Sequence, residues 1–484
     1  MLKIKDSLGI VCAWALLAQV ASAQSLCLPQ LGTAIDTVIQ QPSLRTAYWG
    51  ILVQDLNNGA TPYAYNADQL FLPASNAKLL TTAAALATLT PQVKRQTPFF
   101  ATGQPPTLDT LRVVGQGDPS LNEKQLEQVA LILQSKGVRS IGTLVGDDSF
   151  FTGSLIEPSW SWEDLQGGDG LPINSLMLNG NVFSMQLTPQ QVGQPVRSQW
   201  LSAVKGIVVQ NRAVTVSASA PESIETYWEG NQLTLKGQLR AGSAAETIDI
   251  PVPNPGLNFL DRFRAILGDR QIQVRQVSLT TAAAAPPTQS PPIASIPFPS
   301  FSTLMSEINQ NSNNFYAESV LRLLGKTMPT GSFPSTAQQG LAALKQALTR
   351  LGVNSMGYQL VDGSGLSRKN LVSPRALVQT LKAMTQPQYR DSFRASLPIA
   401  GQSGTLRQRF VGTVAQGRLW AKTGTLQGVT ALSGYLERPD QSPLTFSILV
   451  NHSTQPTAVL QQSVDRVVMA ITQLQRCPSL PNNR

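Results

Sequence analysis

The sequence predicts an α+β protein in which an antiparallel sheet is flanked by helices and additional β-rich domains are inserted. Amphipathic helices and apolar strands dominate both ends of the chain, whereas short alternating strands dominate its middle. Near the N-terminus a helix, a hairpin and a second helix follow one another, which favours helices packed on one antiparallel sheet. A chain of 484 residues is too long for a single hydrophobic core, so several domains are expected.

The first 23 residues have the pattern of a signal peptide. Met1–Lys5 is basic, an apolar stretch covers 8–20, and Ala21-Ser22-Ala23 forms an A-x-A cleavage site. We expect cleavage after Ala23 and export to the periplasm. The residues before Cys27 lack the small-residue pattern that precedes a lipid-modified cysteine, so a lipoprotein is not expected.

Two cysteines, Cys27 and Cys477, remain near the two ends of the mature chain. Domain termini often lie close together and an exported compartment permits disulfides, so we expect a Cys27–Cys477 bridge. Two free thiols are the alternative. Two cysteines and one histidine are too few for a typical metal site, and neither a metal nor another cofactor is expected.

The formal net charge of +9 is compatible with contact between an exported protein and an anionic wall polymer or membrane surface. The Lys and Arg residues are dispersed along the chain, and an exported protein rarely meets nucleic acid, so nucleic acid is not an expected partner.

The mature chain is expected to open with a short amphipathic helix, because Leu31, Ile35 and Ile39 have helical spacing. Residues 47–53 have the composition of a strand. The Asn-Asn-Gly sequence that follows predicts a turn, after which 63–65 can pair back. An Ala-rich apolar run then predicts a buried helix.

The middle of the chain has a different residue pattern. Strands are expected at 111–114, 141–145 and in several runs between 180 and 250, and an Ala/Pro/Ser-rich linker at 281–299. The predicted domains are a discontinuous domain of 24–97 and 300–484, an inserted domain of 98–179 and 250–299, and a small β-rich domain of 180–249.

The character of the first segment returns after the linker. Helices are expected at 301–324 with an interruption at 309–314, at 341–351, from Ser373 to Met384 and at 459–474, and strands at 418–425, 430–435 and 445–450.

Ser75 and Lys78 stand three residues apart at the start of the Ala-rich helix, so they share one face. A helix N-terminus favours a developing anion, and a lysine in a dry pocket can lose its proton and act as a base. The hypothesis is a nucleophilic serine activated by lysine; the alternative is a surface pair at the start of a core helix.

The single histidine limits the other ways of activating a serine. A Ser-His-Asp hydrolase would have to use His452, and the chain has no G-x-S-x-G elbow. His452 follows an apolar strand and is interpreted as structural, so the base of a nucleophilic serine is expected to be a lysine.

Three motifs stand in one order along the chain: Ser75-x-x-Lys78, Ser312-x-Asn314 and Lys422-Thr423-Gly424. This combination resembles the penicillin-binding proteins and serine β-lactamases. Longer stretches resemble the D-alanyl-D-alanine carboxypeptidase/endopeptidase family of low-molecular-mass penicillin-binding proteins. These stretches are Trp160–Leu165, Ser312–Glu318, Asp362–Arg368 and Lys422–Leu426.

The resemblance implies the fold of that family and roles for individual residues. Ser75 would attack the carbonyl of a D-Ala-D-Ala bond in a peptidoglycan stem peptide, with Lys78 as base and its pKa lowered by burial and by Lys422. Ser312 would relay a proton to the leaving amine, and Asn314 would hold Lys78 and the substrate amide. β-Lactam antibiotics would be covalent inhibitors.

The resemblance also implies a substrate-binding strand. Lys422 and Thr423 would bind the terminal carboxylate, and Gly424 would let substrate approach the strand closely. The N–H groups of Ser75 and Thr425 would form the oxyanion hole.

Asp164 and Arg368 are further candidates, for recognising the free end of the peptide's diamino acid; structural pairing within loops is the alternative. Trp160 and Trp162 could form a pocket wall or a packed aromatic loop. Two rival functions stay open. A β-lactamase would share the nucleophile, although no extra general base is evident, and a wall-binding scaffold would have kept the fold without the activity.

Overall fold

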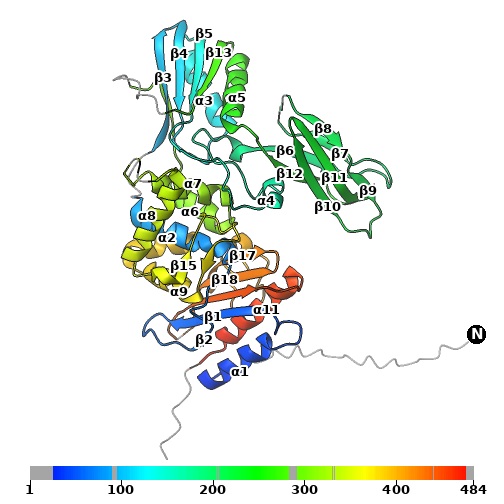
Figure 1. Ribbon diagram of the computed structural model, residues 1–484, viewed down its shortest axis with the longest axis vertical. Helices are drawn as coiled ribbons and strands as arrows, with labels where there is room; N and C mark the ends of the chain where they lie inside the picture. Colours follow the sequence, from blue (N-terminus) through cyan, green and yellow to red (C-terminus); the bar gives the residue numbers. More distant parts are fainter. Residues whose placement is uncertain are drawn as a thin grey trace, which may run out of the picture.

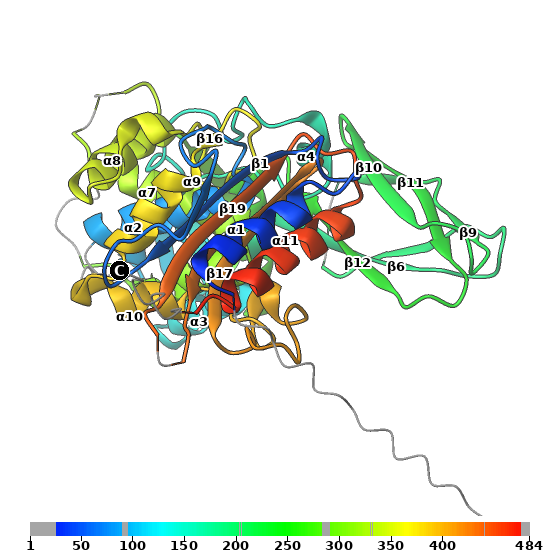
Figure 2. The same ribbon diagram turned by 90° about the horizontal axis from the view of Figure 1, so that it is seen from below.

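The computed structural model describes residues 26–89, 95–202, 204, 206–282, 291–329, 331, 333–439 and 441–475. Figures 1 and 2 show a body of sheet and helices, a second sheet with two helices at one end of it, and a β-rich lobe that projects to one side.

A five-stranded antiparallel sheet joins segments from the two ends of the chain. Its strand order is β17-β18-β19-β1-β2. The strands are β1 (Tyr48–Asp55), β2 (Tyr63–Tyr65), β17 (Leu419–Leu426), β18 (Val429–Leu436) and β19 (Leu444–Asn451). Every residue of β18 and β19 is buried, because helices cover both faces of the sheet.

One face of this sheet is covered by α1 (Leu28–Ile39) and α11 (Thr457–Thr472), which lie side by side in Figure 2. The other face packs against α2 (Ala77–Thr88), whose residues from Ala77 to Leu86 are all buried. Small alanine side chains let the neighbouring helices approach α2 closely. Those neighbours are α6 (Phe301–Gln310), α7 (Asn314–Gly325), α8 (Thr336–Arg350), α9 (Pro374–Ala383) and α10 (Pro387–Ala395). The short pair β15 (Tyr358–Gln359) and β16 (Leu371–Val372) lies beside them.

A second five-stranded sheet has the order β13-β5-β4-β3-β14. Its strands are β3 (Gln96–Gln104), β4 (Thr107–Val114), β5 (Ser140–Asp147), β13 (Gln273–Thr280) and β14 (Ala294–Pro297). The helices α3 (Glu123–Ser135) and α5 (Pro255–Asp269) pack on it through a core that includes Phe99, Phe259 and Phe263.

The β-rich lobe is built from two small sheets. One has the order β12-β6-β7, and the other has β10-β11-β8 with β9 paired to β11. The strands are β6 (Val182–Thr188), β7 (Arg197–Trp200), β8 (Val208–Asn211), β9 (Val214–Val216), β10 (Ser223–Glu229), β11 (Gln232–Arg240) and β12 (Glu246–Pro251). The short helix α4 (Trp162–Gln166) contacts this lobe, and the hydroxyl of Thr226 donates to the carbonyl of Gln166.

The predicted α+β class is confirmed, as are the interrupted helix at 301–324 and the strand-rich character of 180–250. The linker predicted at 281–299 is wrong in part, because Ala294–Pro297 forms the edge strand β14 and pairs with β3. Proline is tolerated on an edge strand, so a proline-rich composition did not exclude a strand there. No helix among the residues that the structure describes is long and apolar enough to cross a membrane.

The predicted signal peptide and Cys477 lie outside the described residues. Cys27 is disulfide-bonded. The chain ends meet near it, since the N–H of Leu26 donates to the carbonyl of Gln473 (2.8 Å) and the N–H of Gln475 to that of Leu26 (2.9 Å). The Cys27–Cys477 pairing stays a prediction, and this geometry is compatible with it.

Candidate active site

Ser75 lies in the 3-10 turn η1 (Ala74–Asn76), directly ahead of α2, with its side chain half-buried. The preceding residue, Ala74, has φ 47°, a left-handed conformation that costs a non-glycine residue on the order of 1 kcal/mol or more. Two glycines allow neighbouring segments to pack closely against this turn. A Cβ on Gly365 would overlap the carbonyl of Ala74, and a Cβ on Gly424 would lie 2.8 Å from the carbonyl oxygen of Pro73.

A glycine is therefore needed at position 424 for a structural reason that was not predicted from the sequence. Its missing side chain lets η1 approach β17, whereas the expectation was close approach by substrate. Asn76 ties the same two elements together: its amide is best satisfied when the nitrogen donates to the carbonyls of Lys422 (2.9 Å) and Thr423 (3.2 Å).

Lys78 has no solvent exposure, and its ammonium group is surrounded by three oxygen atoms. Its Nζ lies 2.9 Å from Ser75 Oγ, 2.6 Å from Asn314 Oδ1 and 2.7 Å from the carbonyl oxygen of Ser364. The lysine thus connects the serine with the start of α7 and with the loop that contains Ser364. The predicted proximity of Ser75, Lys78 and Asn314 is present in the structure.

Burial lowers the pKa of Lys78 from 10.5 to about 8, and the carboxylates of Asp362, Glu318 and Asp169 oppose this shift. A lysine with such a pKa is neutral in about a tenth of the molecules at pH 7, far more than an ordinary lysine. It can then accept a proton from the serine hydroxyl 2.9 Å away.

Lys422 on β17 forms a second buried ammonium site. Its Nζ donates to Ser312 Oγ (2.9 Å) and to its neighbour's carbonyl, that of Thr423 (3.0 Å). Ser312 has φ 57°, another left-handed non-glycine residue, in the loop between α6 and α7. This loop thereby presents Ser312 to Lys422 and Asn314 to Lys78.

Burial, and then the charge of Lys78, hold the pKa of Lys422 well below its usual value. Part of the lowering of the pKa of Lys78 was expected to come from Lys422. Burial is the main cause of that lowering, and the two neighbouring ammonium groups disfavour each other's charge.

A cleft of about 560 Å³ opens above these groups. Its lining includes Ser75, Asp164, Ser312, Asn314, Thr423, Gly424 and Thr425, together with Asp169, Gly365 and Thr405. The edge strand β17 forms one wall and the 160–170 loop another, so a peptide could lie along the strand beside Ser75.

Several supporting residues carried no motif signal of their own. Glu318 on α7 accepts hydrogen bonds from the N–H groups of Gly363 and Ser364, each at 2.8 Å, and contacts Arg322 at 3.2 Å in a fully buried pair. Burial and the nearby Asp362 raise the pKa of Glu318 to about 7. These contacts fix the Ser364 carbonyl that accepts from Lys78.

Asp362 organises the remainder of the loop. Its carboxylate accepts from the N–H groups of Gly365 (2.8 Å) and Ser367 (2.7 Å), and from the indole N–H of Trp160 (3.0 Å). Trp160 is buried, whereas Trp162 is 60% exposed. The two tryptophans therefore differ: the first belongs to the packed loop and the second faces solvent.

Asp164 and Arg368 occupy different positions relative to the cleft. Asp164 lines it, and its Oδ2 also accepts from the N–H (3.0 Å) and hydroxyl (2.8 Å) of Ser161, so it caps α4. Arg368 is exposed and donates to the carbonyl of Gln427 (3.0 Å) at the rim. Thr423 Oγ1 contacts Thr405 Oγ1 at 2.8 Å, a partner that no sequence pattern indicated.

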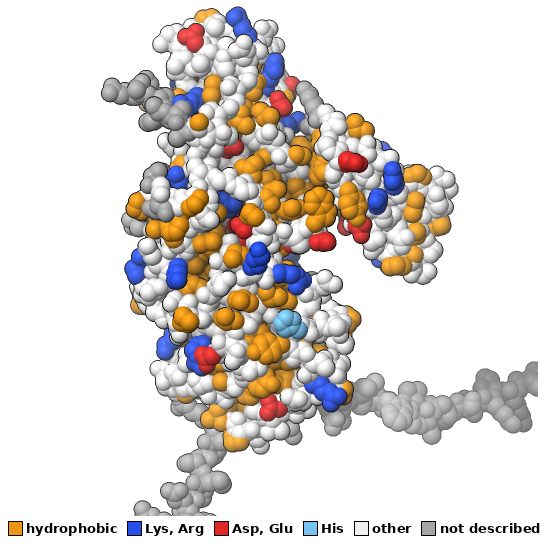
Figure 3. Space-filling model, viewed as in Figure 1, with side chains coloured by type: hydrophobic (Ala, Val, Ile, Leu, Met, Phe, Trp, Pro, Cys, Tyr) orange, Lys and Arg blue, Asp and Glu red, His pale blue; other side chains and the backbone are white. Residues whose placement is uncertain are grey.

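His452 is exposed on the surface, where it is the pale blue side chain in Figure 3, and its ring lies 6.4 Å from that of Tyr48. It is not among the residues that line the cleft. The Lys and Arg side chains on the same face are scattered over the surface.

The fold and this arrangement of Ser75, Lys78, Ser312 and Lys422 define the class of penicillin-binding and β-lactamase-like serine enzymes. The chain belongs to the D-Ala-D-Ala carboxypeptidase 3 (S13) family, whose model matches residues 31–471. It is an enzyme of the serine-type D-Ala-D-Ala carboxypeptidase kind, as the sequence analysis predicted.

Relatives of known function or structure extend over most of the chain. The D-alanyl-D-alanine carboxypeptidase of Actinomadura sp. (strain R39) is 31% identical over 93% of this chain and 86% of its own length. Penicillin binding protein 4 of Haemophilus influenzae, at 24% identity, superposes with a TM-score of 0.80 over 91% of this chain and 99% of its own. It has also been solved in complex with a β-lactam. A predatory peptidoglycan endopeptidase from Bdellovibrio bacteriovorus, at 14% identity, superposes with a TM-score of 0.52 over 90% of this chain and 96% of its own.

Proposed function

We propose that Ser75 is the nucleophile and Lys78 the base of a DD-peptidase that acts on peptidoglycan stem peptides. The contact of Lys78 Nζ with both Ser75 Oγ and Asn314 Oδ1, without solvent exposure, is the observation that carries this proposal. Neutral Lys78 takes the hydroxyl proton as Ser75 Oγ bonds to the carbonyl carbon of the D-Ala-D-Ala bond.

The tetrahedral intermediate then collapses to an ester on Ser75. The nitrogen of the terminal D-Ala leaves with a proton that Ser312 supplies through its hydroxyl. Lys422, hydrogen-bonded to Ser312 Oγ, replaces that proton. Water then attacks the ester and gives a proton through Ser312 to neutral Lys422, while protonated Lys78 returns its proton to Ser75 Oγ as the shortened peptide leaves.

The substrate is held along β17. Lys422 and the hydroxyl of Thr423 bind the terminal carboxylate of the substrate. The side chain of Asn314 forms a hydrogen bond with the substrate amide. The N–H groups of Ser75 and Thr425 stabilise the oxyanion. The close approach of η1 to the strand at Gly424 supports this arrangement.

In this proposal, Asp164 and Arg368 recognise the free end of the peptide's diamino acid. A carboxylate in the lining suits an ammonium group, and a guanidinium at the rim suits a carboxylate. Cross-linked peptides carry such a group close to the scissile bond. This supports endopeptidase cleavage in addition to carboxypeptidase action, as does the fold shared with a peptidoglycan endopeptidase.

We further propose export to the periplasm with a signal peptide of residues 1–23, and peripheral contact with the wall or a membrane surface. The leader pattern and the positive charge support these two points. Separate hydrophobic cores support the division into a discontinuous peptidase domain, an inserted domain and a small β-rich domain.

Mass spectrometry of products tests the function. Purified enzyme should remove one D-Ala from a stem peptide ending in D-Ala-D-Ala and should split a cross-linked muropeptide dimer. Benzylpenicillin should stay covalently bound, since the family is one of D-Ala-D-Ala carboxypeptidases. Penicillin turnover within seconds, without cleavage of either peptide, would instead indicate a β-lactamase, and neither acylation nor cleavage would indicate a scaffold.

A further inference from the structure

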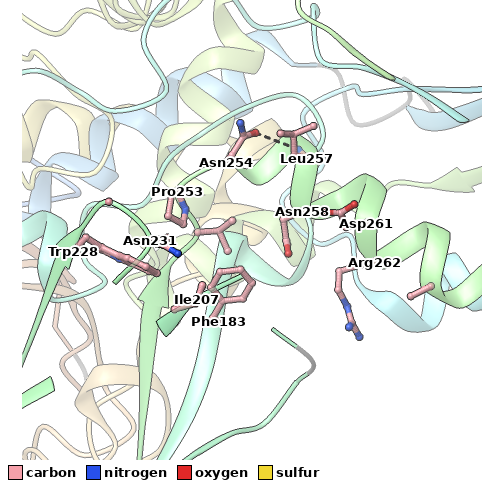
Figure 4. A pocket seen from close by; sticks show the side chains of 13 residues that line it. Phe183, Ile207, Trp228, Asn231, Pro253, Asn254, Leu257, Asn258, Asp261 and Arg262 are labelled. Carbon is pink, nitrogen blue, oxygen red and sulfur yellow. Dashed lines mark hydrogen bonds between the residues drawn. The ribbon is translucent and has the colours of Figure 1, made fainter. Parts of the chain in front are cut away.

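A second pocket, far from Ser75 in the sequence, lies where the β-rich lobe meets α5. Its volume is about 280 Å³, just below the usual range for ligand pockets, which suits a single small ring rather than an extended chain. Figure 4 shows side chains from α5 on one side and from the β-rich lobe on the other pointing toward the same space. The pocket thus exists only because the two lobes meet.

The floor and one wall of this junction pocket are apolar. Phe183 on β6, Ile207 before β8 and Trp228 on β10 contribute from the β-rich lobe, with Val252 and Pro253 from the segment that leads to α5. The indole N–H of Trp228 is buried and has no hydrogen-bond partner among the described residues. The indole therefore offers the pocket its ring, while its N–H is shielded from solvent.

The wall formed by α5 is polar. Asn258 and Asp261 line it, and their side chains make no hydrogen bond or ion pair with other residues that the structure describes. Arg262 also lines the pocket, but its guanidinium is paired with Glu123 (2.7 Å). The positive charge is therefore already compensated, and the unpaired carboxylate of Asp261 disfavours an anionic ligand.

We propose that the junction pocket binds an N-acetylated sugar ring of the peptidoglycan glycan strand. The inference rests on the proposed function for the identity of the polymer. A neutral amino sugar has an apolar face that can pack on aromatic rings, hydroxyl groups that donate to carboxylate and amide oxygens, and an acetamido carbonyl that accepts from an N–H. These features of the sugar match the apolar wall and the polar wall of the junction pocket. The β-rich lobe would then hold the glycan while the cleft processes the attached peptide.

Isothermal titration of the full-length mature enzyme with tri-N-acetylchitotriose, which carries no peptide, tests the pocket directly. We expect saturable binding that weakens about tenfold or more in the Asn258→Ala/Asp261→Asn variant, because two hydrogen-bonding groups are lost. Both residues are partly or fully exposed, and the melting temperature checks that the variant is folded.

Asp269→Asn is the matched control. It makes the same charge change on the same helix at a residue outside the pocket lining, and should leave sugar affinity within about twofold of the parent. Sugar binding that is absent in the parent, or equal in the folded pocket variant and the control, would overturn the inference. Hydrolysis of a soluble D-Ala-D-Ala peptide, measured in parallel, should be unchanged in both variants and reports the proposed peptidase function separately.

Discussion

Lys78 Nζ lies 2.9 Å from Ser75 Oγ, and the lysine side chain has no contact with solvent. Burial and this short distance together give a base that is poised to accept the serine proton. The other two oxygen atoms around the nitrogen come from Asn314 and from the carbonyl of Ser364. These two hydrogen bonds hold Lys78 Nζ in place beside the serine hydroxyl.

Lys78→Arg should abolish this activation while keeping a positive charge in the site. A guanidinium does not lose its proton in proteins, so acylation by benzylpenicillin should slow by about 10²–10⁴-fold. Stopped-flow or gel assays of the fluorescent penicillin adduct measure the rate. The exposed Lys382→Arg is the control and should acylate as the parent does. Parent-like acylation by Lys78→Arg would show that another group removes the proton.

The acylation rate should depend on pH through the titration of Lys78. The base must be neutral, and its pKa is about 8, so the rate should rise nearly tenfold per pH unit below about pH 8 and level off above it. Acylation rates measured from pH 6 to 9.5 decide the point, and a rate that is flat over this range would contradict it.

Ser312 combines a hydroxyl that contacts Lys422 with a strained backbone at φ 57°. Ser312→Ala and Ser312→Gly both remove the hydroxyl, so each should slow hydrolysis of a D-Ala-D-Ala peptide by about 10²-fold or more. Glycine relieves the strain and alanine does not. The glycine variant should therefore be more stable than the alanine variant by about 1 kcal/mol in urea unfolding. Equal stabilities would show that the conformation carries no strain.

Gly424→Ala should push β17 and η1 apart, because its Cβ would lie 2.8 Å from the carbonyl oxygen of Pro73 and 3.2 Å from the Cβ of Ala74. We expect a loss of about 1–3 kcal/mol in the free energy of unfolding and slower acylation. Gly268→Ala on α5 meets no atom within 4 Å and should be neutral or slightly stabilising. Parent-like acylation and stability in Gly424→Ala would mean that the contact between η1 and the strand is not needed.

The buried pair of Glu318 and Arg322 should stabilise the loop that contacts Lys78. Glu318→Gln removes the ion-pair partner of the buried guanidinium and should lower the free energy of unfolding by about 3–5 kcal/mol. It also removes a carboxylate that raises the pKa of Lys78, so the acylation profile should move to lower pH. Glu318→Leu/Arg322→Met should regain stability in urea unfolding. A double variant no more stable than Glu318→Gln would contradict this account of the pair.

Sequence order alone located the motif residues, because Ser75, Lys78, Ser312, Asn314 and Lys422 belong to three recognisable patterns. Their distances in the structure place all five around one cleft. The helix that begins beside Ser75 could also be predicted, since only Thr81 and Thr82 interrupt the Ala- and Leu-rich run that follows Lys78.

The supporting residues could not be predicted in this way. Glu318 and Asp362 act through hydrogen bonds to backbone N–H groups of a loop, and such contacts depend on tertiary packing rather than on local residue types. The same holds for Thr405 and for the edge strand β14. A proline-rich composition predicted a linker for β14, yet pairing with β3 decided its conformation.

The most direct measurement of the central claim is to locate the penicillin adduct. The enzyme is incubated with benzylpenicillin, digested with a protease and sequenced by tandem mass spectrometry. The account predicts a penicilloyl group on Ser75, absent from a folded Ser75→Ala variant. An adduct on Ser312 or on any other residue, or one that persists in Ser75→Ala, would contradict it.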